Sequence, residues 1–308
     1  MRRVLAAVLV LAAGSAHAQQ LDFKRVSRSG DELLSYRWQD SDKREYTTAF
    51  TLTKDAIKEA ETSFREFSMS AMWRYLEVDL RDEVEKFGKG THLNLSRTRD
   101  GLNWTIQAPD QATADLAMQK TKARFAQEQK AYLTQHLRRR LDDGRIMVDY
   151  ASATTALQGP VKEVARALGA TPGIANDDRA RVALALAFLQ EIPYATLEDK
   201  VRIGGDFLPA PAMLAQNRGD CDSKAVALAA ILRSYAPWRK MVMVTMPGHA
   251  ILAVDLPAQP GEWTVRAQGR QYVALEVAGP AMAPVGQVGS HTAKYLKEGR
   301  ETEVWPLN

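Results

Sequence analysis

The run Asn217-Arg218-Gly219-Asp220-Cys221-Asp222-Ser223-Lys224-Ala225 holds the single cysteine of the chain and leads directly into an apolar stretch over residues 225–232. A histidine follows in Met246-Pro247-Gly248-His249-Ala250, where a second apolar stretch begins. The first stretch predicts a helix that starts at the cysteine, and the second predicts a strand that starts at the histidine. This order brings a thiol to a helix N-terminus and an imidazole to a strand end, which a thiol nucleophile and its base require.

The N-terminus has the pattern of a secretory signal peptide. Two arginines precede an apolar run over residues 4–13, and Ala16-His17-Ala18 forms a cleavage site, so residues 1–18 are predicted to be removed. No other segment reaches the roughly 20 apolar residues of a membrane-spanning helix. We therefore expect an exported protein, most simply periplasmic, without a membrane anchor after signal removal. In an oxidising compartment a lone thiol cannot form an internal disulfide, so Cys221 requires another role.

Length and composition predict a globular protein of two domains. The chain has 308 residues, an apolar content of 45% and a formal net charge of only +4. The densest basic cluster, Arg138-Arg139-Arg140, comes at the end of a helical pattern, where cations favour the helix C-terminus. We therefore expect no nucleic-acid partner. Neither a Gly-rich phosphate loop nor an HExxH motif is present, so no nucleotide cofactor and no zinc site are expected.

The pattern of elements predicts an α+β fold. Residues 19–155 form an expected N-terminal mixed α/β module of unknown role. Its predicted elements are strands over 33–38 and 46–52, a helix over 53–87, a hairpin over 92–106, a helix over 113–141 and a strand over 146–150. Ser, Thr, Gly and Pro cluster near residues 151–160 and place the domain boundary there.

The second expected domain, residues 156–308, changes from helices to strands. A helix over 179–190 and the cysteine helix precede strands over 241–244, 249–254, 263–265 and 272–275. Short Pro- and Gly-containing turns separate these strands, which favours antiparallel pairing. We expect the cysteine-bearing helix to pack on this antiparallel sheet.

The flanks of Cys221 favour a reactive thiol over a buried structural one, because they form a polar shell. Asp220 is well placed to be the N-cap, so that Cys221 opens the helix, where unpaired N–H groups and the helix dipole stabilise a thiolate. The carboxylates of Asp220 and Asp222 disfavour that thiolate. The hypothesis of an ionised thiol therefore requires those carboxylates to be held by N–H groups, by Arg218 or Lys224, or by a cation.

A third group should orient the imidazole of His249, and two acids compete for this role. Asp255 is on the same strand, but six residues separate it from His249, which is roughly 20 Å along a strand. Glu276 ends the strand over 272–275, and a cross-strand neighbour can lie within about 5 Å, so we favour Glu276. For the oxyanion, the Cys221 backbone N–H is the natural donor, and Gln216 or Asn217 are candidate side-chain donors.

Over residues 178–286 the chain resembles the bacterial transglutaminase-like superfamily, whose layout is related to that of papain-like cysteine peptidases. The resemblance is carried by Phe188-Leu189-Gln190-Glu191-Ile192-Pro193-Tyr194, by the cysteine run, by His249-Ala250 and by Tyr272-Val273-Ala274-Leu275-Glu276. It implies a cysteine-protease-like domain, a thioester intermediate and a catalytic triad of Cys221, His249 and Glu276. The acid in this family is more often aspartate, and Glu276 departs from that pattern.

Some periplasmic peptidases that resemble this family bind calcium through acids beside the cysteine, and Asp220 and Asp222 match that position. Two acids are too few to predict a metal, so no cofactor is expected and calcium stays a weak candidate.

These observations lead to one main hypothesis and two alternatives. The main hypothesis is an exported cysteine hydrolase that acts on peptide or amide bonds of a protein or peptide substrate. A protein transamidase is a close variant, because the same triad serves when an amine replaces water. The other alternative is a non-catalytic periplasmic binding or scaffold protein that keeps the triad as structure.

Overall fold

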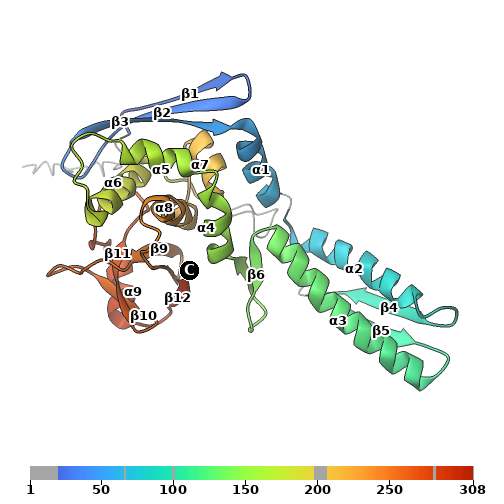
Figure 1. Cartoon of the computed structure of the whole chain (residues 1–308). Coiled ribbons are helices and arrows are strands. Elements are labelled where there is room, and N and C mark those ends of the chain that lie inside the picture. Colours follow the sequence, from blue (N-terminus) through green and yellow to red (C-terminus); the bar gives the residue numbers. More distant parts are fainter. Residues whose placement is uncertain (1–19, 66, 99–100, 198–206, 280–281, 308) are drawn as a thin grey trace, which may run out of the picture.

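The structure, a computed structural model, describes residues 20–65, 67–98, 101–197, 207–279 and 282–307 (Figure 1). The chain has a mixed α+β fold in which every sheet is antiparallel over the described strands, as the sequence predicts. The predicted signal peptide, residues 1–18, lies outside the described residues. Among the described residues, no helix combines the length and the apolar character that a membrane crossing requires.

The N-terminal sheet consists of β1 (Asp22–Arg28), β2 (Asp31–Gln39) and β3 (Glu45–Thr53), in that order. Alternate residues of β2, namely Leu34, Tyr36 and Trp38, are fully buried, so one face of the sheet packs inward. The predicted strands over 33–38 and 46–52 are confirmed. Strand β1 was not predicted, because its side chains are mostly exposed and no apolar alternation marks it.

An arm follows α1 (Lys54–Arg65) and projects away from the rest of the molecule (Figure 1). It consists of α2 (Met69–Glu85), β4 (His92–Arg97), β5 (Leu102–Gln107) and α3 (Gln111–Gln135). The hydroxyl of Ser68 accepts the Ala71 N–H at 3.1 Å and caps α2. The single helix predicted over 53–87 is therefore two helices, because Ser68 has extended backbone angles that no helix continues.

The basic run Arg138-Arg139-Arg140 is not a helix end. Helix α3 stops at Gln135, and the run forms β6 (Arg138–Arg140), which pairs with β7 (Ile146–Val148). Leu137, between them, has φ 52°, a left-handed conformation that no helix continues. Arg138 is buried at 4% exposure instead of being solvated, with its guanidinium 5.1 Å from the Phe67 ring centroid.

Six helices and a five-stranded sheet follow in the described part of the chain after β7. The first five helices are α4 (Tyr150–Gln158), α5 (Lys162–Gly169), α6 (Asp178–Glu191), α7 (Ala210–Gln216) and α8 (Cys221–Tyr235). The sheet has the order β10-β11-β9-β8-β12, from β8 (Met241–Met246), β9 (His249–Val254), β10 (Thr264–Ala267), β11 (Arg270–Leu275) and β12 (Glu303–Pro306). Helix α9 (Ser290–Glu298) precedes β12. The predicted strands of this half are all present, whereas β12 and α9 were not predicted.

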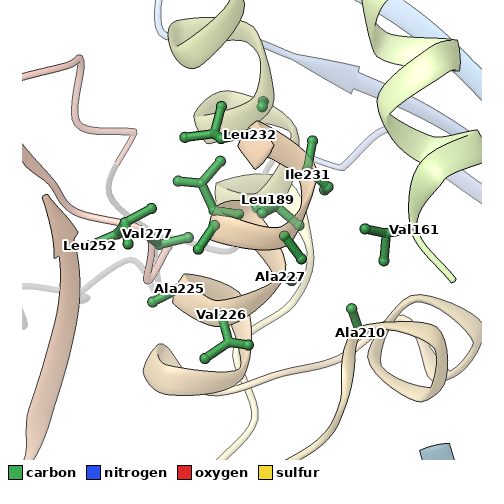
Figure 2. Packing of buried hydrophobic residues seen from close by; sticks show 14 of the residues in the cluster. Val161, Leu189, Ala210, Ala225, Val226, Ala227, Ile231, Leu232, Leu252 and Val277 are labelled. Carbon is green, nitrogen blue, oxygen red and sulfur yellow. The ribbon is translucent and has the colours of Figure 1, made fainter. Parts of the chain in front are cut away.

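Helix α8, which begins at Cys221, lies at the centre of the packing (Figure 2). Residues 225–232 are all buried, which explains why the sequence here is apolar on every face rather than amphipathic. One side of α8 packs on β9, as Figure 2 shows near Leu252, and other sides pack on α4, α5, α6 and α7. The cysteine helix therefore packs on the antiparallel sheet, as expected.

The boundary expected at residues 155/156 does not separate two cores. Residues of β2 and β3 belong to the same apolar cluster as α6 and α8. Tyr36 packs edge-on against Phe188 with ring centroids 5.1 Å apart, and its hydroxyl donates to the Leu214 carbonyl at 2.6 Å. The arm, in contrast, has its own cluster, which includes Trp73, Leu76 and Leu102. The two apolar clusters are therefore separated between the arm and the rest of the chain, and not at residues 155/156.

Candidate active site

The cap of α8 fixes the position of Cys221. Asp220 has extended backbone angles, and its carboxylate accepts the Ser223 N–H at 3.2 Å, so it is the N-cap that the sequence predicts. Cys221 is therefore the first helical residue. Its thiol is half-buried, and the Ala250 backbone N–H acts to lower the pKa of Cys221, so the sulfur lies near the start of β9, in the cavity that Ala250 also lines.

A tight turn places His249 next to that contact. Met246 of β8 pairs with His249 of β9, so Pro247 and Gly248 alone form the connection. Gly248 has φ 70°, and proline followed by such a glycine is the sequence of a type II turn. Cys221 and His249 line the same cavity of about 320 Å³, at the N-terminal end of α8. The structure therefore brings the two residues together.

Glu276 is the acid that contacts the imidazole. It follows β11, which pairs with β9, and its Oε1 lies 2.5 Å from His249 Nε2. Because Nε2 is engaged by Glu276, Nδ1 is the ring nitrogen through which His249 would have to reach the thiol. The alternative acid, Asp255, follows the far end of β9, where it accepts the Lys240 N–H at 2.8 Å and lies 3.7 Å from Arg270. Asp255 therefore lies at the opposite end of β9 from His249, as the length of an extended strand predicts.

The Glu276 carboxylate is held in its charged form. Burial at 5% exposure raises the pKa of Glu276, but hydrogen bonds from His249, Thr292 and the Gly289 N–H outweigh burial, so the pKa lies below its ordinary value. A charged Glu276 can stabilise an imidazolium on His249 and keep the ring in one orientation.

The electrostatics of Cys221 differ from the expectation of an ionised thiol. Burial, followed by the charges of Asp222 and Asp220, raises the pKa of Cys221 to about 12. The N–H groups of Ala250 and Asp222 act in the opposite direction but do not outweigh these effects. The helix start alone therefore leaves the thiol protonated near neutral pH.

The acids beside Cys221 are engaged by α8 itself. Asp222 accepts the Ser223 N–H at 2.8 Å, and Asp220 shares that donor. Burial raises the pKa of Asp220 despite these bonds. Lys224 lies fully buried nearby and donates to the Ile192 carbonyl, and burial lowers its pKa to about 8.

Asp220 and Asp222 are also the weak calcium candidates that the sequence offers. Calcium takes six to eight oxygen ligands, whereas Asp220 and Asp222 supply two carboxylates that already accept backbone N–H groups. In the described part of the chain, no three His, Cys, Asp or Glu side chains are grouped so that they could hold a metal ion. Calcium binding at Asp220 and Asp222 therefore stays an untested prediction, and no chemical step is assigned to it.

The structure places Gln216 and Asn217 away from the thiol. Gln216 donates its amide to Glu61 at 2.9 Å, and Asn217 exchanges two amide hydrogen bonds with Gln20. Neither residue lines the cavity that Cys221 shares with His249. These amides hold the N-terminal segment and α1 against the end of α7, so their geometry does not favour a role as oxyanion donors.

Tyr194 is a site residue that the sequence argument did not single out. It lines the cavity that Cys221 and His249 share, and the charge of Cys221 acts on the pKa of its hydroxyl. Backbone bonds between Gly219 and the Pro193–Ala195 segment hold it there. Burial, followed by the charge of Cys221, raises the pKa of Tyr194 to about 12, so the phenol remains a donor. The available signal was Pro193, which ends α6 and forces the chain to turn toward the cysteine.

No family model matches this chain, and the comparisons with curated proteins and with solved structures likewise found no match.

Proposed function

We propose that this protein is an exported cysteine hydrolase with a transglutaminase-like domain, which cleaves peptide or amide bonds in a protein or peptide substrate. The observation that carries the proposal is the shared cavity of Cys221 and His249, together with the 2.5 Å contact from His249 to Glu276. The resemblance in the cysteine run and the predicted signal peptide support it. A nucleophile, a base and an acid that orients the base are the parts of cysteine hydrolysis.

The raised pKa of Cys221 indicates how the first step proceeds. The thiol is neutral before reaction, so His249 removes its proton through Nδ1 as the sulfur attacks the carbonyl carbon. The oxygen of the tetrahedral intermediate receives the Cys221 backbone N–H and the Tyr194 hydroxyl. The C–N bond then breaks, and the leaving amine takes the proton from the imidazolium, which leaves a thioester on Cys221.

In the second half-reaction, His249 removes a proton from water, and the resulting hydroxide attacks the thioester carbon. The C–S bond breaks, the sulfur regains the proton from His249, and a carboxylic acid leaves. Glu276 stabilises the imidazolium in both halves through its contact at Nε2. A transamidase shares the first half, with an amine in place of water in the second.

A peptide-library digestion of the mature chain, read by mass spectrometry, tests the proposal. We expect cleavage by the wild type and a loss of at least 1,000-fold in Cys221→Ala and in His249→Ala, with the melting temperature retained. Ser223→Ala, at a helix position whose hydroxyl bonds the Leu208 N–H, is the control for a change in α8 outside the triad.

Three outcomes separate the hypotheses. Incorporation of an added amine donor into the product would assign the chain to the transamidases. A thiol that stays unreactive toward iodoacetamide until the protein unfolds would favour the non-catalytic binding role. Cleavage at the wild-type rate by Cys221→Ala would remove the nucleophile assignment altogether.

A further inference from the structure

The two oxygens of Glu276 have different partners. Oε1 contacts His249, whereas Oε2 accepts the Thr292 hydroxyl at 2.6 Å and the Gly289 N–H at 3.3 Å. Gly289 is the N-cap of α9, and Thr292 is the third residue of that helix. The start of α9 therefore holds the carboxylate oxygen that the imidazole does not use.

The Thr292 hydroxyl is placed where solvent cannot replace it. Thr292 is 1% exposed, and Glu276 is 5% exposed. The main chain of Glu276 is fixed separately, because the buried Gln190 amide of α6 donates to its carbonyl at 2.6 Å. What remains to be fixed is the side chain, and glutamate has one more rotatable bond than aspartate.

The same helix turn also contacts the segment that precedes the base. His291 Nε2 lies 3.0 Å from the Pro247 carbonyl, and since a carbonyl only accepts, the ring nitrogen donates. The rings of His249 and His291 lie 6.1 Å apart at 80°. The first turn of α9 thus touches both the acid and the turn that leads into His249.

We propose that Thr292 is a positioning residue of the site: its hydroxyl fixes the Glu276 carboxylate, which in turn holds the His249 ring toward Cys221. This inference rests on the proposed function, since it needs His249 and Cys221 to react. The two donors at the start of α9, the Gly289 N–H and the Thr292 hydroxyl, restrict rotation of the Glu276 side chain. This explains how glutamate, with its additional rotatable bond, can hold the imidazole as a shorter aspartate would.

A purely structural Thr292 would stabilise α9 and nothing else, and the test separates the two roles. Thr292→Val keeps the shape of the side chain and removes the O–H, whereas Thr292→Ser keeps the O–H. The control is Thr264→Val, because the Thr264 hydroxyl accepts from Gln271 at 2.9 Å on the outer strand β10, away from the cavity.

We expect Thr292→Val to lower kcat by about 10- to 100-fold, because this is the size of effect that the loss of one hydrogen bond to a charged group produces. Thr292→Ser should stay within about threefold of the wild type, and Thr264→Val should be unchanged. The Thr292 bond lowers the pKa of Glu276, so its removal raises that pKa. The part of the acid limb of the pH–rate profile that reports protonation of Glu276 should therefore move to higher pH in Thr292→Val but not in Thr292→Ser.

A Thr292→Val protein with wild-type kcat and an unmoved acid limb would overturn the inference while leaving the proposed function intact. If Cys221→Ala and Glu276→Gln were also fully active, the proposed function itself would fail. Should the valine variant not fold, Thr292→Ala is measured in its place, and an unmoved limb there overturns the inference equally.

Discussion

At Cys221, opposing effects act on the proton of the thiol. Burial and the carboxylates of Asp222 and Asp220 raise the pKa of Cys221 to about 12, and two backbone N–H groups only reduce this rise. From the sequence, both the helix N-terminus, which lowers the pKa of the thiol, and the neighbouring carboxylates, which raise it, could be identified. Burial of Cys221 could not, because it depends on elements far away in the chain, and the helix terminus was therefore given too much weight. In the proposed mechanism, His249 is therefore the group that takes the proton, rather than one that stabilises a preformed thiolate.

This balance predicts how Cys221 reacts with iodoacetamide. Below the pKa of a thiol, the thiolate fraction rises tenfold per pH unit, so alkylation of the wild type should climb from pH 7 to pH 10 without a plateau. Asp222→Asn removes a negative charge beside the thiolate and should therefore lower the pKa of Cys221. Each unit by which this pKa falls should raise the alkylation rate about tenfold. The rates are measured with a calcium chelator present.

Asp110→Asn is the matched control, because Asp110 caps α3 in the arm and accepts the Thr113 N–H at 2.8 Å. It should leave alkylation of Cys221 unchanged. A plateau reached near pH 5, or an Asp222→Asn rate at or below the wild type, would contradict the account of a neutral thiol.

Among elements, the β8–β9 hairpin positions His249. Its two-residue connection sets His249 as the first residue of β9, and Pro247-Gly248 supplies the backbone angles for the turn. This feature was predictable, since a proline and a glycine between apolar stretches are a direct turn signal. The Glu276 strand was also predictable, because cross-strand distance alone favours Glu276 over Asp255.

Gly248→Ala tests the hairpin. A Cβ at Gly248 would meet no atom within 4 Å, so the change acts only through φ 70°, which costs L-residues about 1–2 kcal/mol. We expect a loss of about 1 kcal/mol in the free energy of unfolding by urea, and a lower kcat because the turn that precedes His249 shifts. Gly248→Asn, which tolerates this conformation, should lose less.

Gly30→Ala is the control, because a Cβ there also meets no atom within 4 Å but the backbone is not left-handed. Equal effects of Gly248→Ala and Gly30→Ala would mean that the left-handed turn does not matter for the site.

At the scale of the whole molecule, the N-terminal sheet and the helices around α8 share one core, and the arm has another. The sequence could not predict this division. Local patterns located β2, β3, α6 and α8 well, but Tyr36 meets Phe188 and Leu214 across more than 150 residues, and no local signal specifies such a contact. The Ser/Thr/Gly/Pro cluster near residues 151–160 falls at α4, whose N-cap is Asp149.

The same reason limits prediction of the site. The residues next to Cys221 and His249 in the sequence indicate that each belongs to a site. Thr292 and Tyr194 lie far from both in sequence, and only the fold brings them to the site, through α9 and through the turn at Pro193. Gln216 and Asn217 are the opposite case, because they lie next to the cysteine run in sequence but do not line the cavity. Closeness to Cys221 in sequence indicated a role, but the left-handed Asn217 turns the chain so that both amides bond elsewhere.

The central claim, that Cys221 attacks a carbonyl with His249 as its base, is tested most directly by mass spectrometry of an acid-quenched reaction with a cleaved peptide. The account predicts that the peptide around Cys221 gains the mass of the acyl half of the substrate in the wild type. It predicts no gain in His249→Ala. Steady cleavage with no acyl group on Cys221, or with the acyl group on another residue, would contradict it.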